Sequence, residues 1–207
     1  QRESDKVQSE ITAFALRLRP VFDEMARVIR NDGVLVIQTK NIRYGEFLLL
    51  LADTHREIAL NAGFRFVSSV LWQPVPNSRR YPTSFQRSPR VGTFRVIDTE
   101  EFMVFSGGAS IRRGSEILDE SNPNDLVSPV WRLPPNGSSN RHPYGSPPVV
   151  VRRFIELYSE PGDLVVDPFS GYGTTLLEAK KLGRRALGYE LEKECVNQIE
   201  SSLGKSA

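Results

Sequence analysis

The sequence predicts an α/β fold in which a mostly parallel sheet is covered by helices on both faces. Two observations carry this prediction. Amphipathic helical stripes alternate along the chain with short, apolar, β-branched segments, an alternation typical of parallel sheets. In addition, segments 164–166 and 186–189 lead into Asp167 and Glu190, where parallel strands reach the ligand-binding edge of a sheet.

In the first half of the chain, apolar residues at steps of three and four predict a helix over 10–30, with a kink or a restart at Pro20. The Asn-Asp-Gly turn at 31–33 then leads into a buried strand over 34–37. A second helix is expected from about Glu46 to Asn61, ending at Gly63, followed by strands over 64–72 and 102–105.

Residues 107–148 are rich in Gly, Ser, Asn and Pro and predict a long loop, a length that is usually functional. Ser146 should cap the next helix, which has Pro147 and Pro148 in its first turn and directs Val150, Phe154 and Leu157 inward. Strand 164–166, helix 174–182, strand 186–189 and a final helix complete the expected order.

Composition narrows the class of protein. The longest purely apolar run, 47–52, is too short to span a membrane, and we expect a soluble, cytoplasmic protein without a leader. Cys195 is the single cysteine, so neither an internal disulfide nor a cysteine-rich zinc site is expected. Because the chain starts at Gln1 within a polar, helix-like segment, we expect a further segment upstream.

The segment DPFSGYGTT, at 167–175, predicts a ligand site. Gly171 and Gly173 allow a tight turn with amide groups at a helix start, and Glu190 after the next strand can accept hydrogen bonds from a ribose diol. Leu176 replaces the third glycine of the dinucleotide fingerprint, and Asp167 favours a ligand with a positive amino or sulfonium group. S-adenosylmethionine has these groups. The alternative is a tight turn flanked by ordinary capping acids.

With KLGRRALGYELE at 181–192, this segment resembles the cofactor motif of the DNA amino-methyltransferases, which methylate adenine N6 or cytosine N4. HPYGSPPVVVRRFIELYSEPGDLVVD, LRPVFDEMARVIRNDGVLVIQTK and FRFVSSVLWQP are similar to other segments of the family, and the resemblance covers most of 16–203. It implies a Rossmann-like methyltransferase fold with a circularly permuted, β-type motif order. It also implies S-adenosylmethionine binding by Asp167, Phe169, Ser170, Gly171, Gly173, Thr174, Thr175, Glu190 and Ser146.

Two departures from the family pattern stand out. The catalytic tetrapeptide, Asp or Ser followed by Pro-Pro and an aromatic residue, has no counterpart here, since SPPV at 146–149 lacks the aromatic residue and belongs to another motif. We therefore expect the catalytic loop upstream of Gln1. Many relatives also carry Lys where this chain has Ser146. The chain is then one methyltransferase domain, 1–207, with a catalytic-side half at 1–106 and a cofactor half at 147–207.

Segments 77–95 and 107–146 are the candidate DNA-recognition loops. The first contains five arginines, no acid and interleaved aromatic residues, which suits phosphate contacts and base stacking. The candidate DNA-binding residues are Arg79, Arg80, Tyr81, Phe85, Arg87, Arg90 and Arg95, and Arg112, Arg113, Arg132 and Arg141 would extend the surface. The alternative is a solvated, arginine-rich loop. No metal site is expected at His142, and His55 should lie on the surface of a helix.

Three functions remain open from the sequence. The first is a site-specific DNA amino-methyltransferase of a restriction-modification or epigenetic system, with duplex DNA as partner and a cognate restriction endonuclease beside it. The second is a non-catalytic nucleic-acid-binding protein that keeps the fold, motivated by the missing tetrapeptide. The third is a methyltransferase for RNA or a small molecule, because fold alone does not decide substrate.

Overall fold

A computed structural model describes residues 2–44, 47–74, 99–114, 128–134 and 145–204. The helices are α1 (Arg2–Val28), α2 (Leu51–Asn61), α4 (Pro148–Tyr158), α5 (Thr174–Lys181) and α6 (Lys193–Gly204). The strands are β1 (Val34–Thr39), β2 (Ile42–Tyr44), β3 (Phe47–Leu49), β4 (Arg65–Pro74), β5 (Glu100–Ser106), β6 (Val130–Leu133), β7 (Leu164–Asp167) and β8 (Arg185–Gly188).

Four of these strands form a sheet in the order β1-β5-β4-β6. β5 runs antiparallel to both β1 and β4, whereas β6 runs parallel to β4. β1, β4 and β6 therefore point the same way and only β5 is reversed. β7 and β8 form a parallel pair of their own. The predicted α/β fold with a mostly parallel sheet is confirmed, with β5 as the exception.

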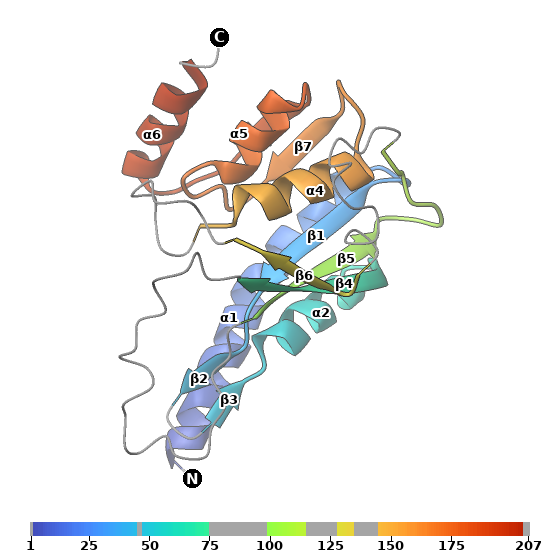
Figure 1. Cartoon of the computed structure of the whole chain (residues 1–207). Helices are drawn as coiled ribbons and strands as arrows, with labels where there is room; N and C mark the ends of the chain where they lie inside the picture. The colour runs from blue at the N-terminus through green and yellow to red at the C-terminus, as the bar shows by residue number, and fades with distance from the viewer. Residues whose placement is uncertain (1, 45–46, 75–98, 115–127, 135–144, 205–207) are drawn as a thin grey trace.

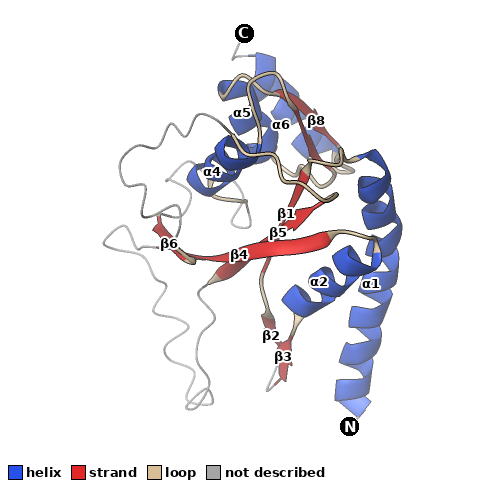
Figure 2. Cartoon of the chain, turned by 90° about the vertical axis from the view of Figure 1, so that its right-hand side faces the viewer, coloured by secondary structure: helices blue, strands red, loops and turns tan. Residues whose placement is uncertain are grey.

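Helices cover both faces of the four-stranded sheet (Figure 2). On one face, Phe22 of α1 and Ile58 of α2 pack with Met103 and Phe105 of β5. On the other face, Phe154 of α4 packs in a cluster with the two tryptophans and with alternate residues of β5. The alternation along β5 thus separates two cores, as the pleat of a strand requires.

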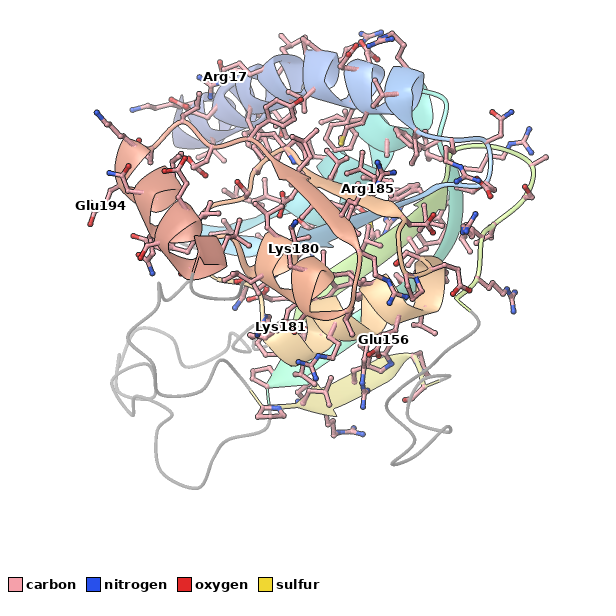
Figure 3. The ribbon with its side chains drawn as sticks, turned by 90° about the horizontal axis from the view of Figure 1, so that it is seen from above. Arg17, Glu156, Lys180, Lys181, Arg185 and Glu194 are labelled. Atoms are coloured by element: carbon pink, nitrogen blue, oxygen red, sulfur yellow. The ribbon has the colours of Figure 1, made fainter. Side chains whose placement is uncertain are left out.

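The same helix, α4, also covers the β7–β8 pair. Its Val151 and Ile155 pack with Ala179 of α5, against Val165 and Ala186 of the two strands. Figure 3 shows the last turn of α5, with Lys180 and Lys181, beside α4. α4 therefore connects the four-stranded sheet to the part of the chain that carries the glycine turn.

Among the described residues, β1 pairs only with β5, and β7 only with β8, so each keeps one free edge. The two strands run in the same direction (Figure 1). Their amino ends are linked through Arg112, whose Nε lies 2.9 Å from Asp163 Oδ2 and whose backbone N–H donates to the carbonyl of Asp32 at 2.8 Å.

Several predicted boundaries are wrong. α1 is continuous from Arg2 to Val28 and does not restart at Pro20. Pro20 and Leu16, four residues earlier, are both exposed, so the carbonyl that loses its helical donor lies on the solvent side. The second helix begins at Leu51 instead of Glu46, because 47–49 pairs with 42–44 as a hairpin. The side-chain oxygen of Asn41 then accepts from Ala52 N–H at the helix start.

Part of the expected 107–148 loop is a strand. Residues 130–133 form β6, which pairs with the end of β4 and buries Trp131 against Phe154. Only four residues long and surrounded by Pro, Asn and Ser, β6 carries too little periodicity to be recognised in the sequence. In the part of the chain that the structure describes, no helix is both long and apolar enough to cross a lipid bilayer.

Candidate functional site

The glycine turn links the carboxyl end of β7 to the start of α5. Gly171 and Gly173 adopt positive φ angles of 50° and 80°, and Gly173 is the N-cap of α5. A turn bond from Gly173 N–H to Ser170 O, 2.7 Å long, closes the loop. No side chain caps α5. The backbone N–H groups of its first turn, at Thr174 and Thr175, are therefore left to donate to a ligand beyond the end of β7.

Close packing on either side explains why glycine is needed. A Cβ on Gly173 would lie 2.7 Å from Ile199 Cγ1 of α6. A Cβ on Gly188, the last residue of β8, would lie 2.5 Å from Leu176 Cδ1 and 3.0 Å from Ser170. The role of Gly188 was missed in the sequence, because a glycine inside a strand pattern does not show what approaches it.

The two predicted acids lie at neighbouring strand ends. Asp167 uses Oδ1 to accept the backbone N–H of Phe169 at 3.0 Å, and no described residue donates to its other oxygen. Glu190 accepts from the backbone N–H of Gly171 at 2.8 Å, Leu191 at 2.7 Å and Glu192 at 2.9 Å. These backbone donors, with Glu192 first, hold the pKa of Glu190 below its ordinary value.

Backbone contacts join the two strand ends into one site. Tyr189 N–H donates to Asp167 O, and both the N–H and the hydroxyl of Ser170 donate to Tyr189 O, all at 3.0 Å. Around this junction Phe169 and Tyr189 are 59% and 58% exposed, and Leu191 is fully exposed. The site therefore combines two acceptor carboxylates, free helix amides and apolar side chains, which suits a ligand with a hydroxylated, a cationic and a flat apolar part.

Eight of the nine predicted cofactor residues lie together in this site: Asp167, Phe169, Ser170, Gly171, Gly173, Thr174, Thr175 and Glu190. Ser146 does not join them through any hydrogen bond of the described residues. It also does not cap α4, whose N-cap is Pro147 without a side-chain bond. Its hydroxyl donates instead to Gln38 Oε1 at the end of β1. Gln38 was missed, although a polar residue at the end of an apolar strand is a signal that sequence reasoning can use.

The predicted DNA-binding residues of 77–95, namely Arg79, Arg80, Tyr81, Phe85, Arg87, Arg90 and Arg95, lie outside the described residues, as do Arg141 and His142. Arg112 is engaged by Asp32 and Asp163, which gives it a structural role. Arg113 and Arg132 are exposed. In the described ranges, no cluster of three or more His, Cys, Asp or Glu side chains could hold a metal ion.

The expected surface position of His55 is wrong. Its ring is half-buried in α2, where Nδ1 lies 2.7 Å from Leu51 O and 3.1 Å from Thr39 Oγ1, and burial lowers its pKa. Since a carbonyl oxygen can only accept, Nδ1 carries the proton.

Sequence comparison finds relatives that are named as type II methyltransferases. The chain is 29% identical over 210 residues to the type II methyltransferase M.MjaI of Methanocaldococcus jannaschii, covering 90% of this chain and 66% of that protein. It is 27% identical over 213 residues to the type II methyltransferase M.MthZI of Methanothermobacter thermautotrophicus, covering 91% and 59%. The chain thus spans less than two thirds of the length of these relatives.

Solved structures share the fold. The PvuII DNA methyltransferase, described as cytosine-N4-specific, superposes with a TM-score of 0.77 at 19% identity, over 93% of this chain and 71% of that one. The M1.HpyAVI–SAM complex superposes with a TM-score of 0.65 at 22% identity, over 91% and 82%. At these identities the likeness establishes the fold.

A family model described as DNA methylase matches residues 1–201, nearly the whole chain. This agrees with the glycine turn and the two strand-end acids, and it confirms the resemblance drawn from the sequence. The chain belongs to the DNA methylase family, that of the N6- and N4-specific amino-methyltransferases.

Proposed function

We propose that this protein is a DNA methyltransferase that uses S-adenosylmethionine to methylate an exocyclic amino group, adenine N6 or cytosine N4, of a base flipped out of duplex DNA. One observation carries the proposal: Asp167, the glycine turn and Glu190 meet at adjacent strand ends in a chain of the DNA methylase family. The likeness to methyltransferases of known class supports it.

The residues present fit S-adenosylmethionine. Glu190 offers an acceptor for the ribose, and Asp167 has a free carboxylate oxygen for a positive group. The amides at the start of α5 suit a carboxylate, since a helix N-terminus favours negative charge. Phe169 and Leu191 provide exposed apolar surface for the adenine ring. When bound, the cofactor supplies an electrophilic methyl group.

The family's Pro-Pro-aromatic tetrapeptide has no counterpart within residues 1–207. An exocyclic amine is a weak nucleophile because its lone pair is delocalised into the ring, so the site must hydrogen-bond the amine and align it. We propose that a Pro-Pro-aromatic loop upstream of Gln1 does this. Among the described strands, β1 and β7 each have one unpaired edge, which supports the proposal because such edges are usually paired or protected.

We further propose that 77–95 contacts DNA, with arginines on phosphates and Tyr81 or Phe85 near the bases, and that the protein acts in the cytoplasm beside a cognate restriction endonuclease. Replacing Arg79 and Arg80 together should weaken DNA binding for all sequences and reduce the salt slope by up to about two units. An unchanged slope would place the DNA on another surface.

Calorimetric titration with S-adenosylmethionine tests the cofactor site. We expect the parent chain to bind, and Asp167→Asn and Glu190→Gln each to bind at least about tenfold more weakly, the effect of losing one charge-assisted hydrogen bond. Glu192→Gln, a matched change of an exposed neighbour, should bind like the parent. Equal affinity in all four proteins would reject the assignment.

Methyl transfer from tritiated cofactor to mixed-sequence duplex DNA tests the activity. A protein that starts at Gln1 should transfer no methyl group, whereas one extended upstream should methylate adenine N6 or cytosine N4. Transfer by the shorter protein would show that the catalytic centre lies within these 207 residues. If the extended protein binds cofactor and DNA without transfer, a non-catalytic DNA-binding role is the better description.

A further inference from the structure

Three polar side chains from different elements meet at the carboxyl end of β1. Gln38 Nε2 donates to Glu100 Oε2 of β5 at 2.5 Å, and Ser146, two residues before α4, donates its hydroxyl to Gln38 Oε1. All three side chains are half-buried. Because a carboxylate only accepts, the amide nitrogen of Gln38 must face Glu100, which leaves its carbonyl oxygen for Ser146.

The strand register explains why these residues meet. Gln38 lies opposite Phe102 in the β1–β5 ladder, and Glu100 is two residues before Phe102, so both side chains project from the face of the sheet that α4 covers. On this face, the amino end of β1 packs through the apolar side chains of Val34 and Val36, whereas its carboxyl end carries the polar cluster. The cluster is thus built into the sheet, and Ser146 is the point at which α4 is attached to it.

α4 packs directly against the cofactor half, so a shift of α4 would be passed on to that half. Pro147, the N-cap, is almost fully buried, and the next turn places Val151 against Ala179 of α5. α5 in turn begins at the glycine turn. Among the described strands, β7 is hydrogen-bonded only to β8. α4 packs both against the four-stranded sheet and against the β7–β8 part, and so joins the two halves.

We infer that Gln38 and Glu100 are positioning residues of the methyl-transfer site. They hold Ser146 and the start of α4 against β1, and thereby set the glycine turn relative to the carboxyl end of that strand. The inference rests on the proposed function and gives Ser146 a positioning role that acts through Gln38.

Exchanging the amide of Gln38 with the carboxylate of Glu100 tests whether their hydrogen bond positions α4. Gln38→Glu places a second carboxylate against Glu100, and like charges at this distance repel. In Gln38→Glu combined with Glu100→Gln, the carboxylate at 38 accepts from the amide at 100 and from Ser146, so every group is paired again. Gln8→Glu, on the exposed side of α1, introduces the same charge as a matched control.

Two readouts apply to these proteins. The first is hydrogen exchange of the amides of Val150 and Val151, which donate to Pro147 O in the first turn of α4. The second is the calorimetric affinity for S-adenosylmethionine. We expect faster exchange and about tenfold weaker binding in Gln38→Glu, the size of one lost charge-assisted hydrogen bond, with recovery to within about twofold in the exchanged pair.

The outcomes separate this inference from the function on which it rests. No binding by the parent chain would reject the proposed function and the positioning role with it. If the parent binds and Gln38→Glu binds equally well, only the positioning role is rejected. If Gln38→Glu binds weakly and the exchanged pair does not recover, the loss comes from damage to the fold, and the hydrogen-bonded link is not its cause.

Discussion

The carboxylate of Glu190 accepts a hydrogen bond from the backbone N–H of Gly171 at 2.8 Å. The residue expected to bind a ribose therefore also ties the turn after β8 to the glycine turn after β7. Glu190 accepts two further backbone N–H groups, and a carboxylate offers about four acceptor positions. One position remains for a ligand hydroxyl, and a second hydroxyl must displace a backbone donor.

This arrangement predicts how stability depends on pH. Because backbone donors lower the pKa of Glu190 in the folded protein, the carboxylate stabilises the fold above its ordinary value of 4.5, and this contribution is lost as the pH falls through the lower folded value. Between about pH 5.5 and pH 3, the free energy of unfolding in urea should fall less steeply for Glu190→Gln than for the parent. Glu192→Gln is the matched control, and equal slopes for Glu190→Gln and the parent would contradict the prediction.

A second prediction concerns the ion pair between α4 and α5. The side chain of Glu178 is only 3% exposed, and its carboxylate contacts Arg152 at 3.0 Å and Lys181 at 2.5 Å. Arg152→Ala leaves this buried charge with one partner and should lower the free energy of unfolding by about 1–3 kcal/mol.

The exposed pair of Glu24 and Arg27 offers the comparison. Both side chains are at least 60% exposed, so Arg27→Ala should lower the free energy of unfolding less than Arg152→Ala does, because solvent screens the exposed pair. Chemical denaturation of both variants measures the difference. An equal loss for Arg27→Ala and Arg152→Ala would show that burial of Glu178 does not strengthen the dependence on its partner.

The cofactor half was predictable from the sequence because its signals are local. The acid, the two glycines and the helix start follow one another within 167–175, and each has a backbone reason to be there. The structure places them as expected, with Gly171 and Gly173 at positive φ. Only the boundaries moved, by one residue each at the end of β7, at β8 and at the end of α5.

The interactions between distant segments could not be predicted in the same way. β6 exists because Val130 and Trp131 find a partner in β4, almost sixty residues earlier, and the hairpin at 42–49 overrides a segment with a helical pattern. Ser146 has the sequence signature of a helix cap, but Gln38, 108 positions away, takes its hydroxyl. Such outcomes depend on tertiary contacts that local propensity does not contain.

His55 provides a third prediction. Burial lowers its pKa from 6.5, so the folded protein disfavours the imidazolium while the unfolded chain binds the proton. The stabilising contribution of neutral His55 is therefore complete above the pKa of the unfolded chain, and the free energy of unfolding falls as the pH drops below about 6.5. His55→Asn keeps a donor for Leu51 O but cannot titrate. Between about pH 7.5 and pH 5.5, the free energy of unfolding in urea should fall less in the variant than in the parent. An equal fall in both proteins would mean that groups other than His55 cause the acid sensitivity.

The last prediction separates two costs of replacing glycine. Gly173 and Gly162 have similar positive φ angles, 80° and 86°, but a Cβ on Gly173 would lie 2.7 Å from Ile199 Cγ1, whereas nothing lies within 4 Å of a Cβ on Gly162. Gly162→Ala should therefore cost only the backbone strain, about 1–2 kcal/mol. Gly173→Ala should cost about 1–3 kcal/mol more, as overpacking does.

Adding Ile199→Ala to each glycine variant isolates the steric part. In the Gly173→Ala background the second change removes the clash. The loss of unfolding free energy in the double variant should therefore be smaller than the sum of the losses in the two single variants. In the Gly162→Ala background they should add. Because Gly173 is the N-cap of α5, whose first-turn amides we propose bind the cofactor carboxylate, Gly173→Ala should also weaken S-adenosylmethionine binding while Gly162→Ala does not. Additive losses at both positions would mean that the contact between the glycine turn and α6 does not constrain residue 173.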